Sequence, residues 1–431
     1  MRIGEQSKPV RVGILGCGTV GSALVRLIEA EASAVEERTG LALEVVRVAV
    51  RNVSARREVE LPEGIVTRDS QSLVTDPGID VIVETIGGIE PARQLILTAL
   101  KSGKPVITAN KELVANCGRE LFEAADAGGV DLMFEAAVGG GIPLIRVLRE
   151  SLVGEPIRRM MGIVNGTTNY ILTRMTEDEA EYSDVLAEAQ RLGYAEADPT
   201  ADVEGFDAGA KAAIMATVGF GVSVVAGDVY QEGISTIGRA DIEAAARLDH
   251  VIKLLAIVER VEGDVAVRVH PAMVPMNHPL AAVRDSFNAV FVQGEAVGDL
   301  MLYGRGAGGF PTASAMMGDL ITAAEHLAQG ISDSMGRLPD ATIRPIDESL
   351  SAFYLRLDVE DRPGVLAAVA TVFGEHGVSI RLMEQEGSGE GAKIVFITHE
   401  AREKDLHRTL VGLEDLEPVV RVGSLIRVVE S

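Results

Sequence analysis

The sequence predicts an α/β protein with a doubly wound parallel sheet at its N-terminus, an α+β region after it and a βαββαβ module at its C-terminus. Three observations predict this. Short β-branched runs alternate with helical spacing up to Phe134, longer helices follow from about Gly139, and a new order of strands and helices begins after a polar stretch near Asp340. At 431 residues the chain is too long for a single hydrophobic core, so we expect two or three domains.

The first region alternates strands with helices. Val10–Leu15 is a β-branched run that ends at Gly16, and the spacing of apolar residues over 19–30 predicts a helix directly after a glycine turn. Further strands are expected at residues 43–50, 81–84, 106–108 and 130–134, separated by intervals long enough for crossover helices. Such spacing is typical of a parallel sheet, so we place a first domain at residues 1–138, completed by residues near 303–340.

The second region contains longer helices. One is predicted over 184–192, with Ser183 as its cap and Gly193 as its stop. The uncharged run 212–227 is shorter than the roughly 20 residues that a membrane-spanning helix needs, so we expect a buried helix there. We place this second domain at residues 139–330 and a linker near 340–347.

The last region, residues 350–431, has its own order of elements. Strands are expected at 352–359, 378–383, 393–398 and 419–428, with one helix from Pro363 and another over 403–413. This order is βαββαβ, and it predicts a separate small domain.

Charge and cysteine content exclude several function classes. The formal net charge of −24 disfavours binding to nucleic acids and anionic membrane surfaces. Cys17 and Cys117 are the only cysteines, so the chain has neither a disulfide framework nor a cysteine cluster for zinc. Residues 1–10 lack the apolar core of a signal peptide, and we therefore expect a cytoplasmic protein.

A dinucleotide-binding motif lies between the first strand and the first helix. It has the G-x-G-x-x-G pattern, in which bare backbone and a helix N-terminus accept a pyrophosphate, and its residues are Gly16, Cys17, Gly18, Thr19, Val20 and Gly21. The alternative is an ordinary glycine turn, because this motif by itself is weak. Its place between a strand and a helix favours a Rossmann-type cofactor site.

The end of the second strand indicates which nicotinamide cofactor is bound. An NAD site would have an acidic residue there for the ribose hydroxyl groups, whereas this strand ends in Arg51, with Arg56 and Arg57 close behind. Guanidinium groups suit a 2′-phosphate, so we infer NADP(H). The alternative is a loop whose arginines are merely solvated.

Asp207 and Lys211 are the candidate catalytic pair. They are four residues apart, so on a helix they share one face, at the head of the uncharged run 212–227. Carbonyl reduction by a nicotinamide needs a proton donor, and a desolvated lysine suits that role. The alternative is a surface ion pair. Neither cysteine has the surroundings of an activated thiolate, which disfavours a thioester mechanism.

Three segments resemble the homoserine dehydrogenase family. They are residues 198–211 (DPTADVEGFDAGAK), residues 162–170 (GIVNGTTNY) and residues 108–111 (TANK), and the resemblance covers essentially residues 10–330. It implies that Lys211 is the proton donor, that Lys111 lies close to nicotinamide and substrate, and that Asp207 positions both. It also implies that Glu196 binds the substrate amino group, although by sequence alone Glu196 is equally a solvated loop acid.

The resemblance adds further cofactor and cation contacts. It assigns Thr85, Lys111, Gly193 and Gly308 to the cofactor, and Pro311 is expected to open the helix after the glycine-rich run 303–309. It also assigns a monovalent cation, for which sodium fits best, to oxygens of Glu135 and to the backbone carbonyls of Val138, Gly140 and Ile142. The alternative for that segment is a glycine-rich hinge.

The C-terminal module resembles an ACT domain. Asp361 is expected to cap a helix with Pro363 in its first turn, where amide groups can hold an amino-acid carboxylate, typically between two chains. The resemblance suggests threonine as effector, and a homodimer or homotetramer. The alternative is a dimerisation module without a ligand.

The resulting hypothesis is a monofunctional enzyme of threonine, methionine and isoleucine biosynthesis. It would reversibly reduce L-aspartate 4-semialdehyde to L-homoserine with NADPH, under feedback through its C-terminal module. The alternatives are another NADP-linked dehydrogenase of amino or hydroxy acids, and a sensor that binds NADPH without turnover.

Overall fold

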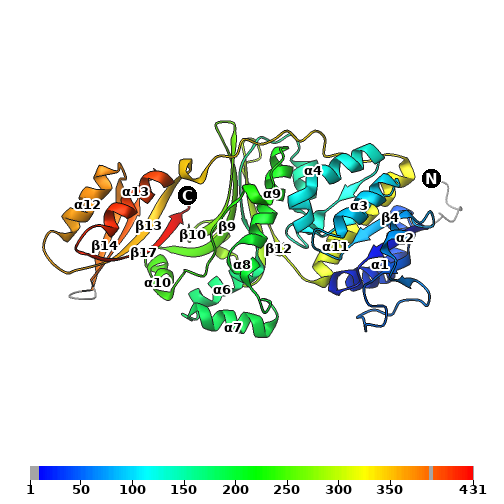
Figure 1. Cartoon of the computed structure of the whole chain (residues 1–431), viewed down its shortest axis with the longest axis horizontal. Coiled ribbons are helices and arrows are strands. Elements are labelled where there is room, and N and C mark those ends of the chain that lie inside the picture. The colour runs from blue at the N-terminus through cyan, green and yellow to red at the C-terminus, as the bar shows by residue number, and fades with distance from the viewer. Residues whose placement is uncertain (1–8, 388–391, 431) are drawn as a thin grey trace. The chain divides into compact units, whose positions relative to one another are not determined.

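A computed structural model describes residues 9–387 and 392–430, and these fold as two compact units (Figure 1). The first unit comprises the chain up to Ile157 together with residues 210–228 and 288–341. The second comprises residues 158–209, 229–287 and those from 342 onward. Residues 1–8, where we expect no signal peptide, lie outside the described part.

The first unit contains the predicted parallel sheet. Its strand order is β3-β2-β1-β4-β5-β6, and neighbouring strands pair in parallel throughout. The strands are β1 (Val10–Leu15), β2 (Leu43–Ala49), β3 (Val66–Thr67), β4 (Val81–Glu84), β5 (Val106–Thr108) and β6 (Leu132–Met133). The strand expected over 130–134 is shorter than predicted, and β3 is too short to produce a detectable pattern. The doubly wound prediction is confirmed.

Helices pack on this sheet and complete its core. They are α1 (Thr19–Thr39), α2 (Ser70–Thr75), α3 (Ala92–Lys101), α4 (Lys111–Gly128) and α11 (Gly309–Gln329). Leu24 of α1 and Ile14 of β1 share one buried cluster with Met316 and Leu320 of α11, so a helix from far along the chain fills the N-terminal core. The first helix is longer than the predicted 19–30, because it continues to a left-handed stop at Gly40.

The remaining elements of the first unit connect it to the rest of the chain. They are η1 (Glu135–Ala137), α5 (Leu144–Arg146), η2 (Val147–Ser151), η3 (Ala226–Asp228), β11 (Phe287–Gly294), β12 (Asp299–Arg305) and most of α9 (Phe206–Phe220). The helix expected over 212–227 therefore begins earlier and ends earlier. It ends because Gly221 has a φ of 63°, in the left-handed region.

The second unit begins with a mainly antiparallel sheet covered by helices. Its strands are β7 (Ile157–Ile163), β8 (Tyr230–Gln231), β9 (His250–Val261) and β10 (Asp264–Pro275), and its helices are α6 (Gly166–Glu177), α7 (Tyr182–Leu192), α8 (Thr200–Val203), α10 (Arg239–Arg247) and the short η4 (Pro279–Ala282). The prediction that Ser183 caps a helix is wrong, because α7 begins at Tyr182 after Glu181. Its predicted stop at Gly193, with a φ of 80°, is confirmed.

The C-terminal module has the predicted βαββαβ order. Its elements are β13 (Leu350–Val359), α12 (Val365–Glu375), β14 (Ile380–Glu386), β15 (Lys393–Thr398), α13 (Glu403–Glu414) and β17 (Val419–Val428), with the short additions η5 (Ile346–Glu348) and β16 (Ala401–Arg402). The predicted Asp361 cap is wrong. The helix starts at Val365, two residues after Pro363, and its N-cap residue is Gly364, which has a φ of 92°.

One sheet of the second unit continues into this module. The strand order is β7-β9-β10-β17-β13-β15-β14, and β17 pairs with β10 in parallel through Ala272↔Arg427 and Met273↔Val428. The module therefore shares backbone hydrogen bonding with the sheet that precedes it in the chain. Among the described residues, no helix combines the length and the apolar character that crossing a membrane requires.

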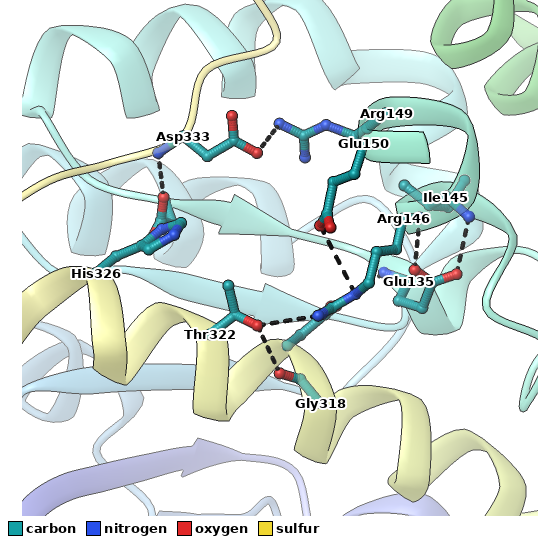
Figure 2. A network of polar contacts seen from close by, with 11 residues as sticks. Glu135, Ile145, Arg146, Arg149, Glu150, Gly318, Thr322, His326 and Asp333 are labelled. Carbon is teal, nitrogen blue, oxygen red and sulfur yellow. Dashed lines mark hydrogen bonds and ion pairs between the residues drawn. The ribbon is translucent and has the colours of Figure 1, made fainter. Parts of the chain in front are cut away.

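A buried polar network ties α11 to the loop after β6 in the first unit. Asp319 of α11 accepts the backbone amide of Glu135 at 2.8 Å and a guanidinium N–H of Arg146 at 3.3 Å. Figure 2 shows the Glu135 carboxylate pointing at the start of α5, where it accepts the amides of Ile145 and Arg146, both at 2.8 Å. Burial raises the pKa of Asp319 to about 7 and also raises the pKa of Glu135.

Replacing Asp319 with Asn should therefore remove a pH-dependent part of the stability. The raised pKa means that the folded state holds a proton that an unfolded Asp, with a pKa near 3.8, has lost. The contribution of protonated Asp319 is present below that unfolded value and is lost as pH rises through about 7. The measurement is urea unfolding of wild type and Asp319→Asn at pH 5, 6, 7 and 8.

We expect the difference in unfolding free energy between the two proteins to fall with rising pH, by at most about 1.4 kcal/mol per pH unit. Glu123→Gln, at an exposed carboxylate of α4, is the control. A difference that does not change with pH would contradict the assignment.

Candidate nicotinamide and substrate site

The glycine turn between β1 and α1 is tightly packed. Gly16 has a φ of 96°, and a Cβ added there would lie 2.9 Å from the carbonyl oxygen of Thr85. A Cβ at Gly21 would lie 2.6 Å from the carbonyl oxygen of Gly16. Gly18 precedes α1 without a side-chain cap, so the helix begins with backbone amides at the surface. Such an N-terminus can accept a pyrophosphate.

Thr85, at the end of β4, holds this turn in place. Its hydroxyl donates to the carbonyl oxygens of Leu15 at 3.2 Å and Gly16 at 3.1 Å. The structure thus brings Thr85 to the glycine turn, although about seventy residues separate them in sequence.

The second glycine-rich run returns to the same place. Gly308, with a φ of 117°, precedes α11, and Pro311 is the third residue of that helix, which therefore begins two residues before the proline expected to open it. A Cβ at Gly309 would lie 3.2 Å from the methyl group of Thr19. The beginnings of α1 and α11 are therefore side by side, and Gly308 lies next to the dinucleotide motif.

Glu84, Thr108 and Asn110 form a polar cluster that the sequence reasoning missed. The buried Glu84 carboxylate accepts the amides of Ile86 at 2.7 Å and Gly87 at 3.0 Å, and it also accepts the Thr108 hydroxyl. Asn110 caps α4 by accepting the amide of Leu113 at 3.0 Å. The sequence does carry a signal for this cluster, because its polar residues stand at the carboxyl ends of adjacent parallel strands. The cluster orders the start of α4, whose first residue is Lys111.

The arginines proposed for a 2′-phosphate lie in the loop after β2. Arg51 and Arg56 are exposed there. Arg57 instead donates to the carbonyl oxygens of Val53 at 3.1 Å and Ala55 at 2.9 Å. Arg57 thus stabilises its own loop, and Arg51 and Arg56 remain the candidates for an anionic ligand.

Lys111 is the first residue of α4 and Lys211 is the sixth residue of α9, and both helices line one small cavity in the first unit. Val114 and Gly118 of α4 line a small cavity with Ile214 of α9. Each lysine lies about one helical turn from this contact, since a turn takes roughly 3.6 residues. Lys211 is half-buried, one turn after Asp207 on the continuous helix α9.

Asp207 is buried and belongs to a hydrogen-bonded group with Asn165 and Asp202. The Asn165 amide donates to Asp207 at 2.8 Å and to Asp202 at 2.7 Å, while its oxygen caps α6 by accepting the amide of Thr168. This residue connects two of the segments that carry the family resemblance. Asn165 lies in one of these segments, but the sequence indicates no role for it, because nothing local points to a partner 42 residues away.

Glu196 and Gly193 lie in the loop after α7. Thr167 donates to the carbonyl oxygen of Tyr194 at 2.7 Å and to Asp202 at 3.1 Å, which anchors this loop to the Asn165 group. Glu196 is exposed, and Gln190 donates to its backbone carbonyl at 3.1 Å. The loop therefore has a fixed backbone and presents an acidic side chain at the surface.

In the candidate cation loop, residues 135–142, the side chain of Glu135 is already hydrogen-bonded within the protein. Both carboxylate oxygens of Glu135 accept amides of α5, which differs from the expectation that its side chain is open to a cation. Of the backbone carbonyls expected to bind the cation, that of Ile142 accepts the amide of Leu144 at 2.8 Å. The described residues contain no group of three or more His, Cys, Asp or Glu that could hold a metal ion.

The cation loop contacts the second glycine-rich run. Gly140 has a φ of 55°, and a Cβ there would lie 2.5 Å from the carbonyl carbon of Gly306. The Gly141 amide donates to the carbonyl of Arg305 at 3.0 Å. Bare backbone at Gly140 is therefore required for this approach.

Known family models match three consecutive parts of the chain. The NAD-binding domain of homoserine dehydrogenase matches residues 16–135, homoserine dehydrogenase itself matches residues 143–321, and the ACT domain matches residues 353–410.

Curated relatives and solved structures agree with these matches. The homoserine dehydrogenase of Corynebacterium glutamicum is 50% identical, over 97% of this chain and 95% of that protein. The crystal structure of a homoserine dehydrogenase from Thiobacillus denitrificans has a TM-score of 0.93 at 42% identity, covering 98% of this chain and 99% of that one. A hyperthermophilic archaeal homoserine dehydrogenase in complex with NADPH has a TM-score of 0.62 at 29% identity, covering 74% of this chain and 98% of that one. The chain belongs to the homoserine dehydrogenase family, with an N-terminal NAD-binding domain and a C-terminal ACT domain.

Proposed function

We propose that the protein reversibly reduces L-aspartate 4-semialdehyde to L-homoserine with NADPH. The observation that carries the proposal is the Asp207 and Lys211 pair on α9, with Asp207 buried and hydrogen-bonded to Asn165 at 2.8 Å. A structural surface pair would not need a buried acid fixed by an amide from another helix.

Each side chain has a distinct task in this reaction. The nicotinamide supplies the hydride when bound. Lys211 donates a proton to the aldehyde oxygen during reduction and receives one from the hydroxyl group in the reverse direction. Glu196 pairs with the substrate ammonium group, Lys111 lies close to nicotinamide and substrate, and Asp207 orients the substrate and Lys211.

Lys211→Ala tests both the reaction and the role of the lysine. We expect the initial rate of NADP reduction with L-homoserine to fall by about 10²- to 10⁴-fold, the usual value of general acid–base catalysis. NADPH binding, followed by its fluorescence, should persist. Lys101→Ala, at an exposed lysine of α3, is the matched control. A fully active Lys211→Ala enzyme would refute the proton-transfer role, and an inactive wild type would refute the reaction.

NADP is the cofactor we propose. Support comes from Arg51 and Arg56, exposed in the loop after β2, and from the absence of an acidic residue at the end of this strand. The NADPH complex of the archaeal relative is consistent with this choice. The 2′-phosphate would lie against these guanidinium groups, while Gly16, Gly18, Thr19, Val20 and Gly21 hold the pyrophosphate.

Arg51→Ala should weaken the preference for NADP over NAD. Loss of one charge-assisted hydrogen bond, worth about 1.5 kcal/mol, corresponds to a decrease of roughly tenfold in kcat/KM for NADP. The value for NAD should stay the same. Arg38→Ala, at the opposite end of α1, is the control. An unchanged ratio of the two values would remove Arg51 from the site.

A monovalent cation, with sodium the best fit, would be held by the carbonyls of Glu135, Val138, Gly140 and Ile142. Its role would be to fix the cation loop against the second glycine-rich run, which meets the cofactor at Gly308. We further propose a cytoplasmic homodimer or homotetramer.

Threonine is the effector that we propose for the ACT domain. Truncation near residue 345 is a poor test, because it would remove β17 from its pairing with β10. A point change at Gly364, whose φ of 92° sets the start of α12, is cleaner.

L-Threonine should lower the initial rate of the wild type, with D-threonine as control. Gly364→Val should raise the half-inhibiting concentration by about tenfold or more, equivalent to at least 1.4 kcal/mol of lost coupling. Its rate without threonine should match the wild type. A wild-type rate that does not respond to L-threonine would remove the effector.

A further inference from the structure

Residues 230–234 lie directly against the start of α9 in the second unit. The Ile234 amide donates at 2.8 Å to the carbonyl oxygen of Val203, the last residue of α8, just before α9 begins. A Cβ added at Gly233 would lie 2.4 Å from that same oxygen. A Cβ at Gly209, between Asp207 and Lys211, would lie 2.1 Å from the side-chain nitrogen of Gln231. The 230–234 segment thus packs without space against the helix turn that carries Asp207.

The other side of the 230–234 segment faces the sheet. Tyr230 and Gln231 pair in parallel with Arg268 and Val269 of β10, and the Glu232 amide donates to the carbonyl of Val269 at 2.9 Å. The opposite edge of β10 is occupied along its whole length by β9, so β17 of the ACT domain, which pairs with Ala272 and Met273, lies on the same edge as the segment. The segment and β17 are therefore neighbours along one edge of β10, three residues apart in its register.

The side chain of Arg427 in β17 contacts the 230–234 segment directly. Its guanidinium donates to the Glu232 carboxylate at 2.7 Å and lies 5.4 Å from the centre of the Tyr230 ring. The arginine is only 4% exposed. A buried guanidinium holds its carboxylate partners firmly, because separation would leave a desolvated charge.

The second partner of Arg427 lies inside the ACT domain. The Nε atom donates to Glu403, the first residue of α13, which is fully buried. Arg427 therefore has two carboxylate partners. Glu232 belongs to the 230–234 segment, whereas Glu403 belongs to the ACT domain itself.

We infer that Arg427 is a positioning residue for the proposed homoserine site, acting from the ACT domain through Glu232 to hold the 230–234 segment against the start of α9. The catalytic consequence rests on the function proposed above. Small displacements of groups that orient a substrate are costly, up to about 100-fold in rate for roughly 1 Å. The placement of Asp207 thus depends on a residue 220 positions later in the chain.

Two variants of the full-length protein separate positioning from simple stabilisation. The Arg427→Met protein would contain two carboxylates without their partner and is prone to unfold. The two carboxylates are therefore replaced one at a time. Glu232→Gln removes the charge of the partner that belongs to the 230–234 segment. Glu403→Gln is the matched control, because it removes the charge of the other carboxylate partner of the same buried arginine.

The readouts are hydrogen exchange of residues 203–211, kcat and KM for L-homoserine, and the dissociation constant of NADPH. For Glu232→Gln we expect faster exchange over 203–211 and a decrease of about 10- to 100-fold in kcat/KM for homoserine, with unchanged NADPH affinity. For Glu403→Gln we expect wild-type values of all three.

Wild-type exchange and kinetics in Glu232→Gln would overturn the inference. Equal losses in both variants would overturn it too, since the effect would then come from a weakened ACT domain. A wild type that binds NADPH without oxidising homoserine would refute the proposed function instead, and the exchange over 203–211 would still decide whether Glu232 holds the start of α9.

Discussion

The first unit depends on the return of α11 to the N-terminal core. Met316 and Leu320 complete the apolar cluster of β1 and α1, so this helix cannot leave without exposing that core to water. Its return brings Gly309 beside Thr19 and brings Gly306 close to Gly140. The two glycine-rich runs and the candidate cation loop therefore meet because one helix far along the chain completes the hydrophobic packing of the sheet.

Buried polar groups then determine the details of the site. A buried carboxylate or amide must find partners, and here those partners come from segments distant in sequence. Asp319 fixes Glu135, and Asn165 joins Asp202 to Asp207. Thr85 fixes the glycine turn in the same way. The candidate catalytic groups thus stand on rigid elements supported by a second layer of hydrogen bonds, which is how proteins hold reacting groups in place.

The ACT domain is joined to the rest of the second unit by more than a linker. Pairing of β17 with β10 gives one sheet, and the ion pairs Arg427–Glu232 and Arg356–Asp241 cross the same boundary. Asp241 also accepts the hydroxyl of Ser424 at 2.7 Å. A change in the shape of this domain would therefore act on β10 and on α10 directly, without needing a moving linker.

The sequence by itself determined the parallel sheet, the βαββαβ order and the motifs, because backbone period and glycine spacing are local. Strands 10–15, 81–84, 106–108, 393–398 and 419–428 have their predicted bounds. Caps at Ser183 and Asp361 were wrong, because the first residue of a helix is decided by what the preceding chain packs against. The use of the Glu135 carboxylate, the role of Asn165 and the pairing of Arg427 with Glu232 were decided only by the tertiary structure. Each depends on which distant segment buries a polar group, and no local pattern in the chain records that choice.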